Sequence, residues 1–483
     1  MPFATASVVT PSVCRALVTA AVVLVLCAES IGAATIVRVR AGDNLQKAID
    51  TAPAGAVIVL PAGAAFTGNF VLPRHGSTEW KTLTTEGSAG EKRIGPEDSG
   101  KLAVLRSPSN QPALTTAPGA RFWRVVGLEI APNTDASGTS IEIGSGVATS
   151  LDELASDIVL DRLLVRGDPQ KGQKRGVALH GRGLTLTRSY VSDFKRDGQD
   201  AQAVYINNGP GPYVITDNYL EGSGENILIG GDTPRIAGLV PADITIESNV
   251  IAKPLTWQGQ PWDVKNLLEM KRARRVMIRN NRFSGNWVAA QAGYAILFTP
   301  RNQNGKAPWT VVEDVRFEGN VVSDVSSAIN VTGDDSEHPS QRTNRIVIRD
   351  NVVATDAKRF GGDGRFMLIG RAPQQLTIEG NTCICDGSSW IYTYKGGTTA
   401  KSEGLVVRGN VARHNKYGFL GDGAAPGAST LAAYYPDAIF EGNVLGGGSA
   451  REYPKNNQFP SADALRSRLE QALQRLDTLS GRR

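Results

Sequence analysis

An asparagine recurs about every 30 residues through the second half of the chain, and this repeat constrains the fold more than any other feature. The residues three and five positions before each asparagine are apolar, with polar residues between them, as in the segment ITIESNV around Asn249. An apolar–polar alternation that ends at a turn residue predicts a half-buried strand, and this period predicts one coil of a β-solenoid. The repeating positions are Asn218, Asn249, Asn281, Asn320, Asn351, Asn381, Asn410 and Asn443.

A solenoid grows in one dimension, so a chain of 483 residues can form one continuous domain with one long core. We expect an N-terminal cap and first coils at 34–120, the β-helix itself at 121–460, and a C-terminal amphipathic helix at 461–483. Within the cap, Asp43 is the predicted N-cap of a short helix that stops at Pro53. The apolar face of the C-terminal helix is formed by Leu465, Leu469, Leu473 and Leu476.

Residues 1–33 have the features of a secretory signal peptide. Arg15 precedes an apolar run over residues 16–28, and small residues follow at 32–34. The run is shorter than the roughly 20 residues that a membrane span needs. We therefore expect a cleaved signal peptide and an exported protein, secreted or periplasmic, without membrane insertion.

The overall charge limits the classes of partner. The formal net charge is +5, which is compatible with an anionic partner but too mild, without a basic tail, to predict binding of nucleic acid. Cys383 and Cys385 are two residues apart on an extended segment and are poorly placed for a disulfide, so we expect both to be buried. We expect a monomer, because a capped solenoid does not require a partner.

The repeated asparagines themselves are expected to be structural. In stacked coils a turn asparagine bonds to the backbone and to the asparagines above and below it, which forms a ladder. Asparagine also tolerates the left-handed turn conformation. Chemistry is therefore to be sought elsewhere on the coils.

The asparagine repeat and segments such as VRFEGNVV, IVIRDNVV and LTIEGNTC resemble the right-handed parallel β-helix proteins of the pectate-lyase-like superfamily. The resemblance covers nearly all of the chain after the predicted signal peptide. It implies an all-β, single-stranded right-handed parallel β-helix. It leaves the activity open, because that superfamily includes polysaccharide lyases, hydrolases, epimerases and non-catalytic surface proteins.

A second strand segment follows each asparagine, and its alternation separates inward from outward side chains. In the segment AVYINN, Val204 and Ile206 face inward, so Tyr205 and Asn207 face outward. Outward residues of successive coils stack side by side and offer a surface to a linear polysaccharide. We expect substrate contacts from Tyr205 and Asn207, and on the same reasoning from His180 and Asn330.

The middle of this outward row carries an unusual group of charges. Glu269 and Lys271 lie on one strand and face the same way, and Arg301 lies one coil later. Aromatic rings stack on sugar faces and charged groups bind carboxylates, so long loops with tryptophans beside these charges predict a sugar-binding cleft. The tryptophans of this segment that we assign to substrate binding are Trp257, Trp262 and Trp309.

A β-elimination on a uronic acid needs a cation to neutralise the carboxylate, a base for the C5 proton and an acid for the leaving oxygen. Lys271 suits the base, and Arg301 suits the neutraliser or the acid. Glu269, with Asp232, is a candidate ligand for Ca²⁺, the one cofactor that we consider. A lysine and an arginine on neighbouring coils with a nearby glutamate resemble the alginate lyase and chondroitinase B group of β-helix lyases.

Two other functions remain open at this point. A glycoside hydrolase on the same scaffold needs two carboxylates about 5 to 9.5 Å apart, and the sequence offers the isolated pair Asp334-Asp335. A non-catalytic glycan-binding protein predicts an outward face without a cleft or a convergent charged pair. With four histidines and no Gly-x-Ser-x-Gly turn, an esterase is disfavoured.

Overall fold

The computed structural model describes residues 34–88, 90–465 and 469, and the chain from Thr35 onward forms one compact unit. The predicted signal peptide lies outside the described residues, as does most of the predicted C-terminal helix. Within the described part, no helix is long and apolar enough to cross a membrane.

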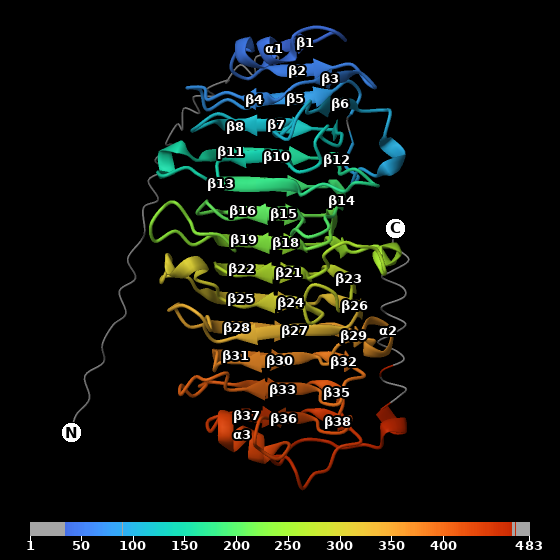
Figure 1. Ribbon diagram of the computed structural model, residues 1–483, viewed down its shortest axis with the longest axis vertical. Helices are drawn as coiled ribbons and strands as arrows, with labels where there is room; N and C mark the ends of the chain where they lie inside the picture. Colours follow the sequence, from blue (N-terminus) through green and yellow to red (C-terminus); the bar gives the residue numbers. More distant parts are fainter. Residues whose placement is uncertain (1–33, 89, 466–468, 470–483) are drawn as a thin grey trace, which may run out of the picture. The chain divides into compact units, whose positions relative to one another are not determined.

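The chain folds as a parallel β-solenoid whose coils contribute short strands to three faces (Figure 1). Two of these faces form one 25-stranded sheet, because the long strand β13 runs through both, and the third face is a 13-stranded sheet. All strands within each face pair in parallel, which confirms the predicted parallel β-helix.

The ladder face consists of the strands that precede the repeated asparagines, together with their counterparts in the earlier coils. Its strands are β1 (Ile36–Arg38), β2 (Val57–Leu60), β5 (Lys81–Thr85), β8 (Arg121–Val126), β11 (Ala155–Asp161), β13 (Arg175–Thr187), β16 (Tyr213–Thr216), β19 (Ala242–Glu247), β22 (Ala273–Arg279), β25 (Val312–Glu318), β28 (Asn344–Arg349), β31 (Gln374–Glu379), β34 (Val406–Arg408) and β37 (Ile439–Glu441).

The site face carries the segments whose outward residues we assigned to function. Its strands are β4 (Phe70–Leu72), β7 (Leu114–Thr116), β10 (Thr139–Gly144), the first half of β13, β15 (Gln202–Ile206), β18 (Glu225–Ile229), β21 (Asn266–Met270), β24 (Tyr294–Phe298), β27 (Ser327–Thr332), β30 (Met367–Gly370), β33 (Ile391–Tyr394) and β36 (Phe419–Gly421).

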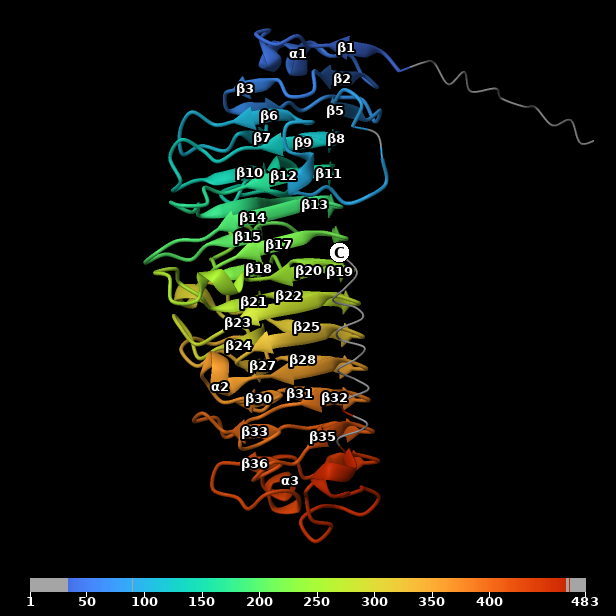
Figure 2. The same ribbon diagram turned by 90° about the vertical axis from the view of Figure 1, so that its right-hand side faces the viewer.

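The third face follows the asparagines, and Figure 2 brings its strands into view. They are β3 (Ala65–Thr67), β6 (Ala103–Arg106), β9 (Leu128–Ile130), β12 (Leu164–Arg166), β14 (Tyr190–Phe194), β17 (Tyr219–Gly222), β20 (Val250–Ala252), β23 (Arg282–Asn286), β26 (Val321–Val325), β29 (Val352–Thr355), β32 (Thr382–Ile384), β35 (Val411–Arg413) and β38 (Val444–Gly446).

Short helices lie at the ends and corners of the solenoid: α1 (Leu45–Thr51), α2 (Ala357–Phe360) and α3 (Ala428–Tyr434). Helix α1 begins one residue later than we predicted. Its N-cap is Asn44, whose side chain accepts a hydrogen bond from the Lys47 amide, whereas the carboxylate of Asp43 accepts from the Arg40 amide. The prediction of Asp43 was wrong because two adjacent residues both suit the position.

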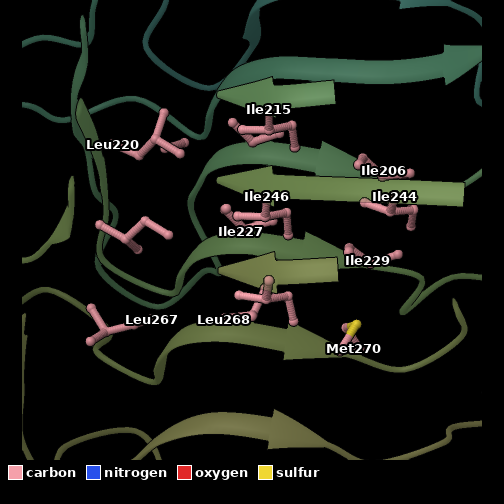
Figure 3. Close-up of a cluster of buried hydrophobic side chains, with 14 of the residues drawn as sticks. Ile206, Ile215, Leu220, Ile227, Ile229, Ile244, Ile246, Leu267, Leu268 and Met270 are labelled. Atoms are coloured by element: carbon pink, nitrogen blue, oxygen red, sulfur yellow. The ribbon is translucent and has the colours of Figure 1, made fainter. Parts of the chain in front are cut away.

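The interior is a continuous stack of aliphatic and aromatic side chains. Ile206, Ile229 and Met270 occupy equivalent places in successive coils and point into the core (Figure 3). All three are fully buried, as is Val204, so the predicted inward direction of Val204 and Ile206 is confirmed. The thiols of Cys383 and Cys385 are free and buried, as expected.

The asparagines form a continuous ladder between the ladder face and the third face. Asn249 is typical: its side-chain amide donates to Oδ1 of Asn281 at 2.9 Å and to the carbonyl of Ile215 at 2.8 Å. One expectation was wrong. The left-handed residue is the one before each asparagine, such as Asp217 (φ 52°) or Gly319 (φ 60°). Glycine, aspartate and asparagine dominate that preceding position because they tolerate this conformation.

Candidate functional site

A cavity of about 570 Å³ lies where the site face turns into the ladder face, along coils β21 to β33. It lies beyond the carboxyl ends of five neighbouring site-face strands, so each coil contributes the first residues of its turn. We call it the Lys271 cavity. The side chains and backbone that line it belong to Lys271, Thr299, Pro300, Arg301, Gln303, Thr332, Asp334, Asp335, Ser336, Arg371, Tyr394 and Gly396.

Lys271 is the first residue after β21, and its direction is set by Glu269 two residues earlier on the same strand. The ammonium nitrogen lies 2.8 Å from Oε1 of Glu269. The lysine side chain keeps 24% of its surface exposed, whereas the glutamate side chain keeps 3%. The amine therefore lines the cavity while a buried carboxylate holds the amine itself in place.

Arg301 enters the same cavity from the next coil. Its backbone amide donates to the carbonyl of Lys271 at 3.0 Å, which fixes the two residues side by side. Its guanidinium forms an ion pair with Asp335 at 3.0 Å and a second with Glu337. The hydrogen bond to Glu337 raises the pKa of this guanidinium, so Arg301 stays charged. The structure thus brings Lys271, Glu269 and Arg301 together, as the sequence suggested.

The acidic residues that line the cavity are both held by arginines. Asp335 is 1% exposed in its side chain, and besides Arg301 it accepts hydrogen bonds from the backbone amides of Asn302 and Glu337. Asp334 pairs with Arg342 at 3.1 Å and with Arg371. The adjacent pair that suggested hydrolysis is therefore engaged in structural ion pairs.

A second carboxylate, Glu225, lies on β18 one coil before Glu269. It accepts a hydrogen bond from Gln202 at 2.8 Å and is 1% exposed. Burial, and after it the charge of Glu269, raises the pKa of Glu225 to about 7. The two buried carboxylates therefore repel each other, and the charge of Lys265 offsets part of this effect at Glu225.

The site-face residues upstream of the cavity, from which we expected substrate contacts, are buried. His180 is 3% exposed, accepts a hydrogen bond from the Asn208 amide, and packs edge-on against Tyr205. Arg175 lies 4.0 Å from the ring centroid of Tyr205. Asn207 is 2% exposed and accepts a hydrogen bond from Arg272 at 2.7 Å. Substrate contact stays a prediction for these residues, and their burial shows that an outward direction on a coil does not ensure exposure when neighbouring side chains cover the face.

The assigned tryptophans Trp257 and Trp262 also pack against other side chains. Trp257 is 5% exposed and packs in a satellite cluster with Trp287 and Phe360, and the partly buried Trp262 packs against this cluster. The ammonium of Lys195 lies 5.0 Å from the ring centroid of Trp257 and 5.4 Å from that of Trp262. In the loop before β21 these rings pack on one another and on Lys195, and a role in substrate contact stays a prediction for Trp257 and Trp262.

Two further predicted contacts lie apart from the Lys271 cavity lining. Trp309 is partly exposed, and its indole donates to the carbonyl of Leu239 at 3.2 Å, which ties its loop to the loop of an earlier coil. Asn330 is also partly exposed, on β27, and its Oδ1 has no hydrogen-bond partner among the described residues. Neither residue lines the cavity, so a role in substrate contact stays a prediction for both.

The residues assigned to calcium do not assemble a calcium site. Asp232 is exposed, and its carboxylate accepts a hydrogen bond from the Thr233 amide. One oxygen of Glu269 is held by Lys271, and the other is buried and has no hydrogen-bond partner in the described part of the chain. Within the described residues, no group of three or more acidic, histidine or cysteine side chains is placed to hold a metal. Since Ca²⁺ takes about six to eight oxygen ligands, this donor set does not fit it.

Sequence reasoning missed two residues of the cavity, Arg371 and Tyr394. Tyr394 is the last residue of β33 and is in register with Gly370 and Thr332, and Arg371 is the first turn residue after Gly370. The signal was present in the aligned outward positions, which continue through Gly370 and Tyr394.

No protein-family model and no curated protein matches the sequence. Solved structures do match. An alginate lyase of polysaccharide lyase family 6, AlyGC, superposes with a TM-score of 0.56 at 15% identity, covering 88% of this chain and 53% of that chain. The catalytic unit of an α-1,3-glucanase of family GH87 from Streptomyces thermodiastaticus strain HF3-3 gives 0.50 at 14% identity, covering 87% and 66%. These likenesses show the fold, a right-handed parallel β-helix.

Proposed function

We propose that the protein is an exported polysaccharide lyase that cleaves a uronic-acid-containing polymer by β-elimination in the Lys271 cavity. One observation carries the proposal. Lys271 and Arg301 come from adjacent coils to one cavity, and both acidic side chains that line this cavity are already bound by arginines. The cavity therefore offers cationic and basic groups to a substrate, rather than a free carboxylic acid.

In this mechanism the guanidinium of Arg301 binds the carboxylate of the reacting uronate. Its partner Glu337 is 60% exposed, so the substrate carboxylate can replace it while Asp335 keeps the arginine in position. Neutralising the substrate carboxylate stabilises the negative charge that develops when the C5 proton is removed. Arg301 thus supplies the electrostatic part of catalysis.

In this mechanism the Lys271 amine acts as the base and takes the C5 proton of the bound uronate. The C5–H bond breaks, a C4–C5 double bond forms, and the bond from C4 to the leaving oxygen breaks. The ammonium formed on Lys271 lies beside that oxygen and returns the proton to it. Glu269 acts as a positioning residue because it orients the amine from below.

A glycoside hydrolase is the second candidate, since Glu225 has a raised pKa of about 7 beside Glu269. A hydrolase of this kind needs one protonated and one ionised carboxylate on either side of the scissile bond. Glu225 and Glu269 are 1% and 2% exposed, which leaves no room between them for a sugar and a water. The Lys271 cavity therefore supports elimination better than hydrolysis.

The test is a screen of alginate, pectate, chondroitin and hyaluronan that records two products. Elimination yields an unsaturated sugar that absorbs in the ultraviolet, and hydrolysis yields new reducing ends without this absorbance. We expect ultraviolet-absorbing product from at least one polymer, and the same rate with a calcium chelator. Reducing ends alone would select the hydrolase, and neither product from any polymer would contradict a catalytic role on these uronates.

A further inference from the structure

A second cavity, of about 370 Å³, lies next to the Lys271 cavity at the end of the solenoid. It is enclosed by the turn that follows β33 and by α3, which lies at the last coils (red in Figure 1). Its walls include the side chains of Tyr394, Tyr434 and Tyr435, so we call it the tyrosine cavity. Its size is at the lower end for ligand pockets, which suits a short saccharide unit.

The aromatic walls of the tyrosine cavity are held rigidly. The hydroxyl of Tyr435 lies 2.7 Å from Oγ1 of Thr393, and the hydroxyl of Tyr434 donates to the carbonyl of Asp422 at 2.8 Å. The covering turn is anchored as well, because Ser402 donates to the carbonyl of Pro373. Fixed tyrosine rings beside hydroxyl groups offer the apolar and polar contacts that a sugar ring needs.

The charge of the tyrosine cavity favours an anion. Lys395 and Lys401 line it, and none of the residues that line it is acidic. The ammonium of Lys395 lies 5.5 Å from the ring centroid of Tyr434, so the positive charge is held against an aromatic wall. A third cavity, of about 220 Å³, shows the contrast, because Glu142 and Glu153 line it without any cation.

The two positively charged cavities are continuous in the fold. Tyr394 lines both, and Arg371 of the Lys271 cavity binds the carbonyl of Gly396 in the turn that covers the tyrosine cavity. From β21 to β33 there are five parallel strands at about 4.8 Å spacing, so Lys271 and Tyr394 are separated by roughly 20 Å along the solenoid axis. A ligand that fills both cavities is therefore a chain of several sugars running from coil to coil.

We propose that the tyrosine cavity is a remote subsite that binds a uronate unit of the same polymer, several sugars away from the bond at Lys271. Tyr394 and Tyr434 contact the sugar ring, and Lys395 and Lys401 bind its carboxylate. This inference rests on the proposed function for the identity of the polymer. It adds that recognition extends well beyond the reacting sugar and that short oligomers are bound more weakly than long ones.

The test measures binding separately from cleavage. Calorimetry records the affinity of hexasaccharides prepared from alginate and from pectate for the Lys271→Ala protein, which does not turn them over. Adding Lys395→Ala and Lys401→Ala is expected to weaken binding of the hexasaccharide at least about tenfold, or about 1.4 kcal/mol. The matched control replaces Lys358 and Lys455, two exposed lysines outside the cavity, and is expected to leave the affinity unchanged.

A second variant removes space instead of charge. Ala400 lines the tyrosine cavity and is exposed, so Ala400→Trp fills the cavity without disturbing the core. It is expected to weaken hexasaccharide binding to a similar extent and to leave the unfolding temperature unchanged. Unaltered affinity in both the lysine and the tryptophan variants would overturn the proposal, as would an equal loss in the control pair.

The outcomes separate this inference from the lyase proposal. Binding that depends on Lys395 and Lys401 without any ultraviolet-absorbing product from the wild type would support the subsite and contradict the lyase. Product formation by the wild type, together with a hexasaccharide affinity that does not change when Lys395 and Lys401 are replaced, would support the lyase and contradict the subsite. Failure of the Lys271→Ala protein to bind either hexasaccharide would contradict a uronate as the ligand of the tyrosine cavity.

Discussion

Two corners of the same coil differ in how much variation they permit. At the corner between the ladder face and the third face, two residues separate the strands in each of the eight asparagine-bearing coils, as with Asp217 and Asn218 between β16 and β17. The first of the two residues always has a left-handed conformation, with φ between 52° and 65°. The second is always the asparagine of the ladder.

At the corner between the site face and the ladder face, the turns differ in length from coil to coil. We call this corner the variable corner, and the corner that carries the asparagine ladder the uniform corner. The turn after β21 spans residues 271–272, whereas the next one spans 299–311 and the one after that 333–343. These turns supply most of the lining of the Lys271 cavity. The comparison shows that a uniform corner keeps the coils in register, so the other corner is free to vary in length and to carry a binding site.

Substitution of Arg301, at the variable corner, is expected to have the largest effect on activity. Arg301→Ala removes the group that neutralises the substrate carboxylate, so we expect kcat/KM to fall by about 10²- to 10³-fold. Initial rates of ultraviolet-absorbing product formation measure this. Arg279→Ala serves as the matched control, because Arg279 is likewise paired with an acid, Glu247, but lies on the ladder face. Loss of activity in the control as well would show that any lost ion pair inactivates the protein.

Substitution of a ladder asparagine, at the uniform corner, is expected to reduce stability instead. Asn320 is buried, accepts two hydrogen bonds from Asn281 and donates to Oδ1 of Asn351 and to the carbonyl of Ile278. Asn320→Ala leaves these backbone groups unsatisfied, so we expect the free energy of unfolding to fall by about 2 to 3 kcal/mol.

Chemical denaturation measures the effect of this substitution. The exposed Asn110→Ala is the control, with an expected change below about 0.5 kcal/mol. A change of that size in Asn320→Ala would mean that the ladder contributes little to the stability of the coils.

The difference between the corners also explains what the sequence could reveal. The ladder was predictable because a turn of constant length places the same residue type at the same point of each coil, as with Asn249 and Asn281. Lys271 and Arg301 were also predictable, because both follow strands whose apolar alternation sets the register. The burial of His180, Asn207 and Trp257 was not predictable, because it depends on loops that pass over a face, and the local pattern of a strand carries no information about such loops.

A smaller effect concerns pH and the buried part of the site face. Burial, and then the charge of Arg175, lowers the pKa of His180 from 6.5 to about 3. The folded state thus resists protonation of His180, so its contribution to stability is complete above pH 6.5 and is lost as pH falls toward 3. Between pH 6.5 and 5 we expect the wild type to lose about 2 kcal/mol more than His180→Gln.

Unfolding temperatures measured across this pH range provide the test. Glu221 and Glu225 have pKa values raised to about 7 by burial, so their contribution is present below pH 4.5 and is lost as pH rises through 7. The wild type and His180→Gln both retain Glu221 and Glu225, so the effect of these glutamates on stability cancels when the two proteins are compared. Parallel curves for wild type and His180→Gln would show that His180 is not the group that resists protonation.

The smallest expected effect concerns Glu337, which lies in the turn after β27 at the variable corner. Glu337 competes with a substrate carboxylate for Arg301, and it is largely exposed. Because an exposed ion pair contributes less than about 1 kcal/mol, Glu337→Ala is expected to lower KM about threefold with little change in kcat. Glu403→Ala removes one exposed acid elsewhere and is the control for overall charge. An equal fall of KM in both variants would assign the effect to net charge alone.

The central claim is that Lys271 is the base in the cavity at the variable corner. The most direct measurement compares ultraviolet-absorbing product formation by the wild type, Lys271→Met and Lys306→Met, the last being an exposed lysine of the neighbouring turn. We expect Lys271→Met to lose about 10³-fold in rate while it still unfolds in one cooperative transition, with full activity in Lys306→Met. A Lys271→Met protein that still forms the unsaturated product at the wild-type rate would contradict the account.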